Sequence, residues 1–373
     1  FPEGKEAGAV MYIYLITLIV SLLFAKLASN ARPYPALKGT VRTYAICSFL
    51  PFALNCMLRG QVGTDWLIYD AYYAEISNGG RRFSEPLFNL LNRILYMISN
   101  NSLLLFAVVG FITLALFFAG MYQQSAMVTY SILLFFLSGK YFASLNQIRQ
   151  MLAMSLFFFA FKYIRERKMI RYFLFILAAC LIHTSAVVYI PLYFLYGIRC
   201  STKRLIKAAL VYCVCLPVII LMAPVLVKLT RFSWYLDSRF SQNFDIIGFT
   251  LSLMIFGLHL FLLRRQEMQA KGTTGENSED LKYAGFLTMI SMITCLVYFL
   301  TNAVPQVTRI AECYSVIQIL SLPYLAKGEK DARIRIAVLV FTAAVLGCKL
   351  LYNVYSTHWW YGVLPYHTFF YPG

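Results

Sequence analysis

Residues 102–120 read SLLLFAVVGFITLALFFAG, a run of nineteen residues without a charged side chain. A helix rises about 1.5 Å per residue, so such a run crosses most of a hydrocarbon core of about 30 Å. Further apolar blocks lie at 11–27, 43–58, 125–139, 141–164, 171–183, 184–198, 205–229, 246–263, 282–301, 311–326 and 334–352. Because lipid requires every backbone polar group to be paired internally, the blocks predict an all-α polytopic membrane protein with about 10–12 transmembrane helices. The two short blocks between 171 and 198 predict either two spans or a re-entrant pair.

The composition of the 373-residue chain agrees with a membrane protein. Hydrophobic residues make up 60% and charged residues 13%, against about 25% charged in a soluble domain. The net charge is +17, and most basic residues stand at the ends of apolar blocks, where the positive-inside rule and anionic headgroups favour them. This placement predicts membrane lipid as a partner and argues against nucleic acid. Basic clusters at 165–171, 199–207 and 327–335 fall on one side under alternating traversal, which predicts the cytoplasmic face there and both termini outside.

The polar segments predict the organisation of the chain. Residues 1–10 are expected to be a non-native remnant before Met11, and residues 11–373 a single transmembrane domain. This domain is expected to carry an external loop at 59–101, a cytoplasmic linker at 264–281 and an external aromatic tail at 353–373. Within the loop, EPLFNLLNRILYMI from Glu85 predicts an amphipathic helix. The other external loops are short.

Signatures of nucleotide and metal chemistry are missing from the sequence. GxGxxG, GxxxxGK[ST] and GxSxG do not occur, which argues against a nucleotide-fuelled pump, a dinucleotide enzyme and an α/β-hydrolase. The four histidines are scattered, and the nine cysteines include no CxxC pair. We therefore expect no metal, no cofactor and no disulfide framework.

Three arginines stand where the positive-inside pattern does not place them. Arg59 opens RGQVGTDWLIYDAYY, Arg149 lies in LNQIRQ inside an apolar block, and Arg309 lies in PQVTRIAE at an external end. An arginine at membrane depth costs about 2.5–3.5 kcal/mol on insertion, so it is retained beside a cavity or a partner. Its planar fork of donors suits phosphate oxygens, which makes these three residues candidates for binding a lipid pyrophosphate.

Structural roles remain open for these arginines. Arg149 and Arg309 could instead form ion pairs with Asp65, Glu85 or Glu312, or extend to the interface. Arg81 and Arg82, in the external loop, fit either interpretation.

His183 in LIHTSA, at a predicted external turn, is a candidate general base because imidazole accepts a proton near neutral pH. A histidine bonded to a backbone carbonyl is the alternative. Asp65 and Glu85 are further catalytic candidates, since a partly desolvated carboxylate can do the same work. Candidate sugar-binding residues are the external aromatics and the amides of LNQIRQ, namely Tyr69, Tyr72, Asn146 and Gln147.

Taken together, these motifs resemble the EpsG family of Wzy-type polysaccharide polymerases. The resemblance rests on RGQVGTDWLIYDAYY, Glu85-Pro86, LNQIRQ, LIHTSAVVYIPLYFL, Arg309 and WYGVLPY, in that order along the chain. It implies a GT-C-like helical fold in the bacterial inner membrane, with the active site facing the periplasm or exterior. It also implies metal-independent transfer, with inversion, of a growing glycan from undecaprenyl pyrophosphate to the non-reducing end of another lipid-linked repeat unit.

The same resemblance implies roles and partners. Arg149 and Arg309, with Arg59 as a further candidate, would hold the pyrophosphate, and His183 would act as the base or support it. A chain-length regulator and a flippase of the same pathway are the implied protein partners.

Two other functions remain alternatives to a polymerase. An O-antigen ligase uses the same donor but usually carries a larger external loop than the predicted 43 residues of 59–101. A flippase or exporter of lipid-linked oligosaccharide would be expected to show internal repeats and charges along a path through both leaflets. A membrane acyltransferase is a third alternative, although the chain lacks a paired catalytic histidine motif.

Overall fold

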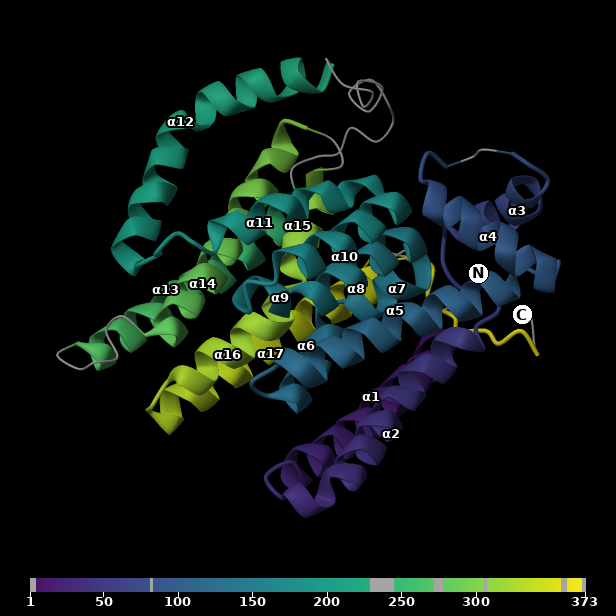
Figure 1. The fold of residues 1–373 in the computed structure, drawn as a ribbon, viewed down its shortest axis with the longest axis horizontal. Coiled ribbons are helices and arrows are strands. Elements are labelled where there is room, and N and C mark those ends of the chain that lie inside the picture. The colour runs from purple at the N-terminus through teal and green to yellow at the C-terminus, as the bar shows by residue number, and fades with distance from the viewer. Residues whose placement is uncertain are drawn as a thin grey trace. The chain divides into compact units, whose positions relative to one another are not determined.

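The computed structural model describes residues 5–80, 83–228, 245–271, 278–304, 307–356 and 361–370 (Figure 1). Within these ranges the regular structure is helical, and the one isolated β-bridge pairs Arg59 with Thr368. The helices include spans long and apolar enough to cross a membrane. The predicted all-α polytopic membrane fold is confirmed.

Six helices in the described ranges have the length and composition of a membrane span. They are α1 (Lys5–Ala31), α5 (Leu103–Gln124), α12 (Thr202–Lys228), α13 (Ile246–Ala270), α14 (Glu279–Phe299) and α17 (Ala332–Ser356). A seventh results if α6 (Val128–Leu137) and α7 (Lys140–Asn146), bent by 55°, count as one broken span. These numbers are lower than the about 10–12 spans expected from apolar blocks alone.

The difference arises because several apolar blocks fold as shorter helices. Gly139, with a φ of 80°, separates α6 from α7; this left-handed conformation ends one helix and allows the next to change direction. The other short helices in apolar blocks are α8 (Ile148–Ala160), α9 (Lys162–Arg165), α15 (Val307–Ser315) and α16 (Gln318–Gly328). α2 (Lys38–Met57) is 20 residues long but does not have the apolar composition of a span.

The segment 171–198 contains two short helices. α10 (Met169–Ile182) ends at His183, and a 3-10 turn over Thr184–Tyr189 leads into α11 (Ile190–Leu195). With 14 and 6 residues respectively, both helices are shorter than the about 20 residues of a full span. Of the two predicted alternatives, these lengths favour the re-entrant pair.

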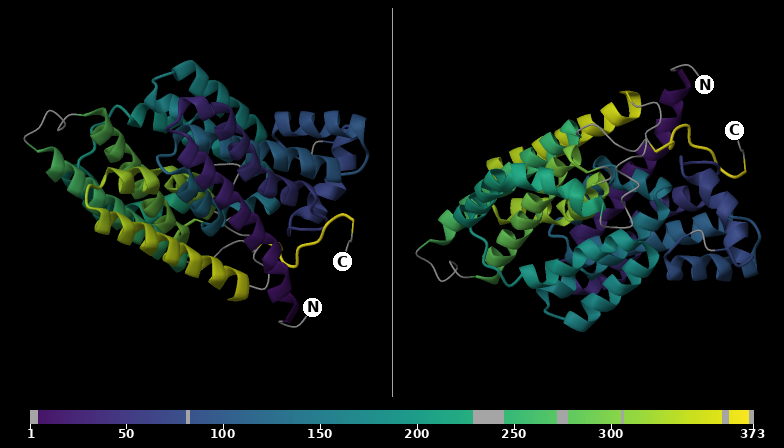
Figure 2. Two further views of the ribbon diagram at one scale, coloured as in Figure 1. Left: turned by 90° about the horizontal axis from the view of Figure 1, so that it is seen from below. Right: turned by 90° about the horizontal axis from the view of Figure 1, so that it is seen from above.

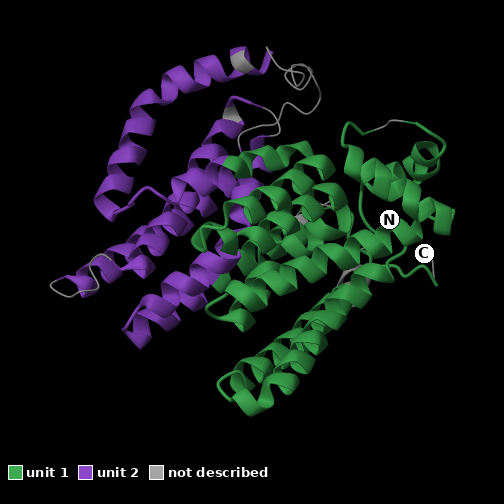
Figure 3. Ribbon diagram, viewed as in Figure 1, with its two compact units in different colours: residues 1–190, 343–373 green, residues 191–342 purple. Residues whose placement is uncertain are grey.

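Figure 3 distinguishes two compact units, residues 1–190 with 343–373 and residues 191–342. In the first unit, α2 packs against α1 and α5, while α8 packs against α5 and α10. The long α1–α2 pair is visible in Figure 1. This packing brings α8, which carries Arg149, beside α10, which ends directly before His183.

Two glycines allow α5 to approach its neighbours closely. A Cβ at Gly120 would lie 2.7 Å from Cδ1 of Phe158 in α8, and a Cβ at Gly110 would lie 2.5 Å from Sγ of Cys56 in α2. Both distances are shorter than van der Waals contact. Small residues at such positions are typical of closely packed membrane helices.

The predicted external loop contains α3 (Trp66–Ser77) and α4 (Pro86–Ile98), which lie near the C-terminal segment in Figures 1 and 2. α4 buries Phe88, Asn92 and Leu95 on one face. Its other face exposes Leu90, Ile94 and Met97. α4 is therefore an amphipathic helix, as the sequence predicted.

The other predicted segments are partly described. Residues 264–270 of the expected linker belong to α13, and α14 begins at Glu279, while residues 272–277 lie outside the described residues. In the expected aromatic tail, α17 continues to Ser356 and residues 361–370 fold back against residues 58–64. Residues 357–360 of that tail lie outside the described part of the chain.

In the second unit, a buried carboxylate joins the ends of three helices. Both carboxylate oxygens of Glu329, which follows α16, accept hydrogen bonds from Arg265 of α13, at 2.7 and 3.0 Å. Gln269 and the backbone N–H of Asp331 donate to the same carboxylate. The hydrogen bond from Arg265 is the largest cause that lowers the pKa of Glu329 to about 2, so this group stays ionised near neutral pH.

Candidate functional site

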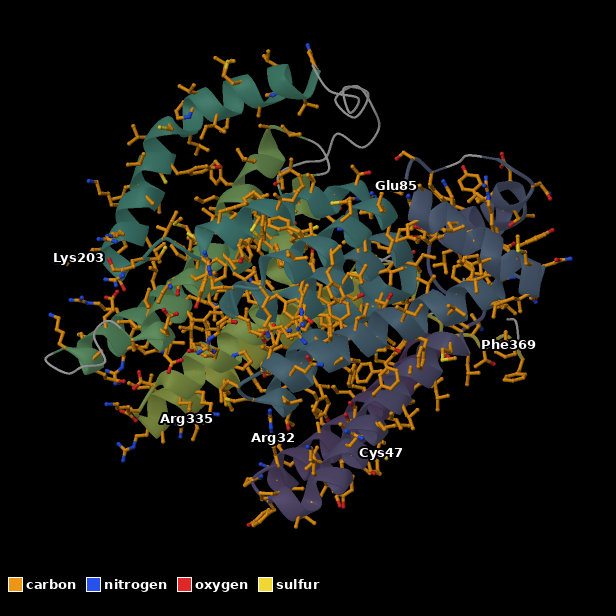
Figure 4. All side chains as sticks on the ribbon, in the orientation of Figure 1. Arg32, Cys47, Glu85, Lys203, Arg335 and Phe369 are labelled. Atoms are coloured by element: carbon orange, nitrogen blue, oxygen red, sulfur yellow. The ribbon has the colours of Figure 1, made fainter. Side chains whose placement is uncertain are left out.

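Glu85 lies at the centre of the candidate site. It precedes α4, where Pro86 occupies the first helical position, which tolerates the missing N–H of proline. Its side chain is 9% exposed. The carboxylate points to where α8 begins and α10 ends, and Figure 4 labels it beside these helices.

Arg149 forms an ion pair with Glu85. Nη1 of Arg149, in the first turn of α8, donates to Oε2 of Glu85 at 3.1 Å. Nε of Arg149 donates to the hydroxyl of Tyr69 at 3.3 Å, and its guanidinium lies 3.8 Å from the ring centroid of Phe83. Nη2 makes no hydrogen bond to a described residue, and the side chain is 18% exposed. Arg149 is thus held on two edges and has one amino group left for a ligand.

The opposite oxygen of Glu85 faces the turn after α10. Oε1 accepts a hydrogen bond from Oγ1 of Thr184 at 2.9 Å and from the Thr184 backbone N–H at 3.3 Å. Nδ1 of His183 lies 3.9 Å from the same oxygen, and the imidazole is 16% exposed. This separation is longer than a hydrogen bond, so Glu85 acts on the imidazole through its charge.

The surroundings of Glu85 and Tyr69 set the charge of each side chain at neutral pH. Burial raises the pKa of Glu85, but hydrogen bonds from Thr184 and the charge of Arg149 outweigh it and lower the pKa below the usual value. Burial raises the pKa of Tyr69 despite the nearby Arg149. At neutral pH the site therefore contains an ionised Glu85 and a neutral Tyr69.

The other predicted site residues lie around this cluster. Oδ1 of Asn146 accepts hydrogen bonds from the Asp65 backbone N–H at 2.8 Å and from the Thr64 hydroxyl at 3.2 Å, so Asn146 holds the turn before α3. The rings of Tyr69 and Tyr72 both contact Phe83. Oε1 of Gln147 is buried and has no hydrogen-bond partner among the described residues.

Two of the three predicted pyrophosphate residues are not part of the Glu85 cluster. Arg59 is fully enclosed in the first unit, although the sequence predicted an accessible external position. Arg309 lies in α15 of the second unit, where it is exposed. Arg81 and Arg82 lie outside the described residues.

Two residues of the cluster were not identified from the sequence. Thr184 binds Glu85, and Phe83 stacks on Arg149. Their only signals were their positions next to other candidates, in LIHTSA and in the stretch before Glu85. Within the described ranges, no group of three or more His, Cys, Asp or Glu side chains could hold a metal ion. Metal independence stays a prediction.

A comparison with protein families matches the EpsG family over residues 42–368. No curated protein matches this chain. No solved structure matches it either. The family match includes all of the residues of the Glu85 cluster as well as Arg59 and Arg309. Since it covers most of the chain, this multi-pass membrane protein belongs to the EpsG family of polysaccharide-biosynthesis proteins.

Proposed function

We propose that this protein is a polysaccharide polymerase. It transfers a growing glycan from undecaprenyl pyrophosphate to the non-reducing end of another lipid-linked repeat unit, at the external face of the bacterial inner membrane. Membership of the EpsG family supports polysaccharide biosynthesis as the pathway. The site supports a transfer reaction within it, because charged side chains at membrane depth are retained chiefly for function.

The observation that carries the proposal is the cluster around Glu85. One carboxylate links Arg149, from the start of α8, with Thr184 and His183, from the end of α10. A structural ion pair would need only Arg149 and Glu85. The addition of a partly exposed imidazole and an unused guanidinium amino group gives the cluster both a proton acceptor and an anion-binding donor.

The proposed reaction is a single displacement. The acceptor hydroxyl loses its proton to His183, its oxygen bonds to the anomeric carbon of the donor glycan, and the bond from that carbon to the pyrophosphate oxygen breaks. The pyrophosphate leaves with the electron pair, and Arg149 stabilises the charge that develops on it. Glu85 is a positioning residue that holds both groups. Attack opposite the leaving group inverts the anomeric centre.

Other predicted residues have supporting roles in this proposal. Tyr69 and Tyr72 stack on sugar rings from α3. Arg309 of the second unit stays a predicted pyrophosphate residue. Asp65 and Gln147 extend the polar lining.

The function is tested with purified protein in detergent and native lipid-linked repeat units, without nucleotide or divalent metal. We expect a ladder of lengthening glycans on a gel from the wild type and from Arg93→Gln, which removes an arginine of α4 that donates to the backbone of Ile76. Arg149→Gln and His183→Ala are expected to abolish the ladder. If the wild type forms no ladder but moves labelled lipid across liposome bilayers, it is a flippase and the polymerase proposal is wrong.

A further inference from the structure

The guanidinium of Arg59 is enclosed without the partners that such a group requires. The side chain has 0% exposure. Nη1 contacts only Sγ of Cys56 at 3.5 Å, a weak acceptor, and the carbonyl oxygen of Ser144 at 3.4 Å. Nε and Nη2 have no hydrogen-bond partner among the described residues. Each of these donors was desolvated on folding without compensation.

No described carboxylate balances the charge of Arg59. The charged or polar groups that interact with it electrostatically are Cys56 and the phenols of Tyr14, Tyr141 and Tyr366. The hydroxyl of Tyr141 is also buried without a hydrogen-bond partner in the described chain. Burying an unpaired ion is strongly unfavourable, so a purely structural role for Arg59 is poorly supported.

The two unused donors of Arg59 have a defined geometry. Nε and Nη2 form one edge of the guanidinium fork, and this edge binds two oxygens of a phosphate or carboxylate side by side. The face of the guanidinium lies 5.3 Å from the ring of Phe106. The Nε–Nη2 edge thus has the geometry to bind an oxyanion, but Arg59 is fully buried, so an oxyanion cannot reach it.

The C-terminal segment lies against Arg59, and the phenol of Tyr366 in this segment is among the groups that Arg59 acts on electrostatically. Residues 361–370, here called the C-terminal strap, pair with residues 58–64 through the Arg59–Thr368 bridge. The Gly60 N–H donates to the carbonyl of His367 at 2.7 Å, and the Phe369 N–H donates to the carbonyl of Leu58 at 3.1 Å. A Cβ at Gly60 would lie 3.0 Å from the backbone of Thr368, so glycine permits this close approach.

The strap is held by hydrogen bonds and by packing, since Val363 is buried and the ring of Tyr366 lies 5.6 Å from that of Tyr14. The hydroxyl of Tyr14 donates to the carbonyl of Val363, and the hydroxyl of Tyr366 donates to the carbonyl of Asn55. Its last described residues are exposed, with 37% for Phe369 and 65% for Phe370, and Figure 4 labels Phe369 at the edge of the first unit. Opening of the strap must therefore break these hydrogen bonds and expose Val363, whereas its end at Phe370 is already exposed.

Aromatic contacts connect the enclosed Arg59 to the Glu85 cluster. The ring of Phe106, which faces Arg59, also lies 6.4 Å from the ring of Tyr69. Tyr69 in turn accepts the hydrogen bond from Arg149. Two aromatic side chains in series, Phe106 and Tyr69, therefore link Arg59 to the arginine of the candidate site.

We propose that the C-terminal strap gates an oxyanion-binding site at Arg59. When residues 361–370 move away from residues 58–64, the Nε–Nη2 edge of Arg59 and the hydroxyl of Tyr141 bind an oxyanion of the glycan substrate. This oxyanion is either a phosphate of the lipid carrier or a carboxylate of an acidic sugar, which have the same bidentate chemistry. The inference rests on the proposed function for the identity of the substrate.

The test locks the strap with a disulfide in a Cys56→Ala background. Leu58→Cys and Phe369→Cys introduce the pair at directly opposed positions, where antiparallel geometry allows a bridge. Ser125→Cys with Ser131→Cys, whose hydroxyl oxygens are 2.7 Å apart, provides a matched control cross-link away from the strap. Calorimetry measures binding of inorganic pyrophosphate and, separately, of glucuronate to the full chain in detergent.

We expect the reduced strap pair to bind at least one of the two anions, and oxidation to weaken that binding by about tenfold or more. The control cross-link should leave binding unchanged. A preference for pyrophosphate would identify the carrier phosphate as the natural ligand, and a preference for glucuronate would identify an acidic sugar. Equal affinity of the oxidised and reduced strap pairs, or binding of neither anion, would overturn the proposal.

Arg59→Met separates a binding role from a structural one. If Arg59 is an anion site, this neutral side chain of similar length should weaken anion binding by about tenfold or more and leave the unfolding temperature equal or higher. Arg93→Gln should change neither quantity. A lower unfolding temperature with unchanged binding would assign Arg59 a structural role and refute the proposal. These readouts do not depend on glycan transfer, so their failure is distinct from failure of the polymerase assay.

Discussion

Replacing Glu85 by glutamine tests whether this carboxylate holds the candidate site together. The amide has the same shape and keeps an oxygen that can accept the hydrogen bonds from Thr184, but it loses the charge that pairs with Arg149 at 3.1 Å. The substitution therefore removes chiefly the ion pair with Arg149. Because Glu85 is 9% and Arg149 18% exposed, solvent screens this pair only partly.

The expected size of the effect of Glu85→Gln follows from the kind of hydrogen bond that is lost. A hydrogen bond to a charged group contributes about 1.5–3 kcal/mol, and the partial exposure of Arg149 places this one near the lower limit. A loss of about 1.4 kcal/mol in positioning lowers a rate about tenfold. We expect Glu85→Gln to reduce glycan transfer at least about tenfold and the free energy of unfolding by about 1.5 kcal/mol.

A double-mutant cycle isolates the pair. Glu85→Gln, Arg149→Gln and the double variant are compared by unfolding in detergent, and we expect a coupling energy of about 1 kcal/mol or more. The pKa of Glu85 is lowered from 4.5, so the coupling should be fully present above that pH and decline as the pH falls through the lowered value. Additivity within about 0.5 kcal/mol at neutral pH would refute the reasoning, because it would mean that the ion pair contributes nothing.

Three further predictions concern packing, charge and donor geometry. Gly120→Ala should destabilise the fold by about 1–3 kcal/mol, measured by thermal unfolding, because its Cβ would meet Phe158 at 2.7 Å, whereas Gly257→Ala, with nothing within 4 Å, should be neutral. Glu329→Gln should lower stability at neutral pH by about 2 kcal/mol; since the pKa of Glu329 is lowered to about 2, the wild-type advantage should be complete above pH 4.5 and vanish as the pH falls towards 2 in acid-unfolding curves. Arg149→Lys should reduce transfer about tenfold or more although the charge is kept, because lysine cannot donate to Glu85 and Tyr69 as a fork; wild-type activity would contradict this.

The membrane class of the protein could be predicted because a helix that crosses lipid needs a long run of apolar residues, and such runs are visible in the sequence. The number of long helices could not be predicted in the same way. Hydropathy does not register the left-handed Gly139 that divides α6 from α7, or the 3-10 turn after His183. Both breaks depend on backbone conformations that the surrounding helices stabilise.

The candidate site was predictable residue by residue but not as an arrangement. Arg149 was singled out as a charge inside an apolar block, and Glu85 and His183 as external groups that could act as a base, yet their contacts depend on how α4, α8 and α10 meet. For Arg59, by contrast, the sequence predicted an accessible side chain, whereas the structure buries it. The backbone of Arg59 pairs with Thr368, about 300 positions away in the chain, and no local pattern could reveal that contact.

The most direct test of the proposed transfer is the stoichiometry between glycosidic bonds formed and undecaprenyl pyrophosphate released. Purified protein would be supplied with radiolabelled lipid-linked repeat units, and both products would be counted over the same interval without added nucleotide. We predict one molecule of released carrier for each new bond, with both quantities falling together in Arg149→Gln. Bond formation without carrier release, or carrier release without bond formation, would contradict the account.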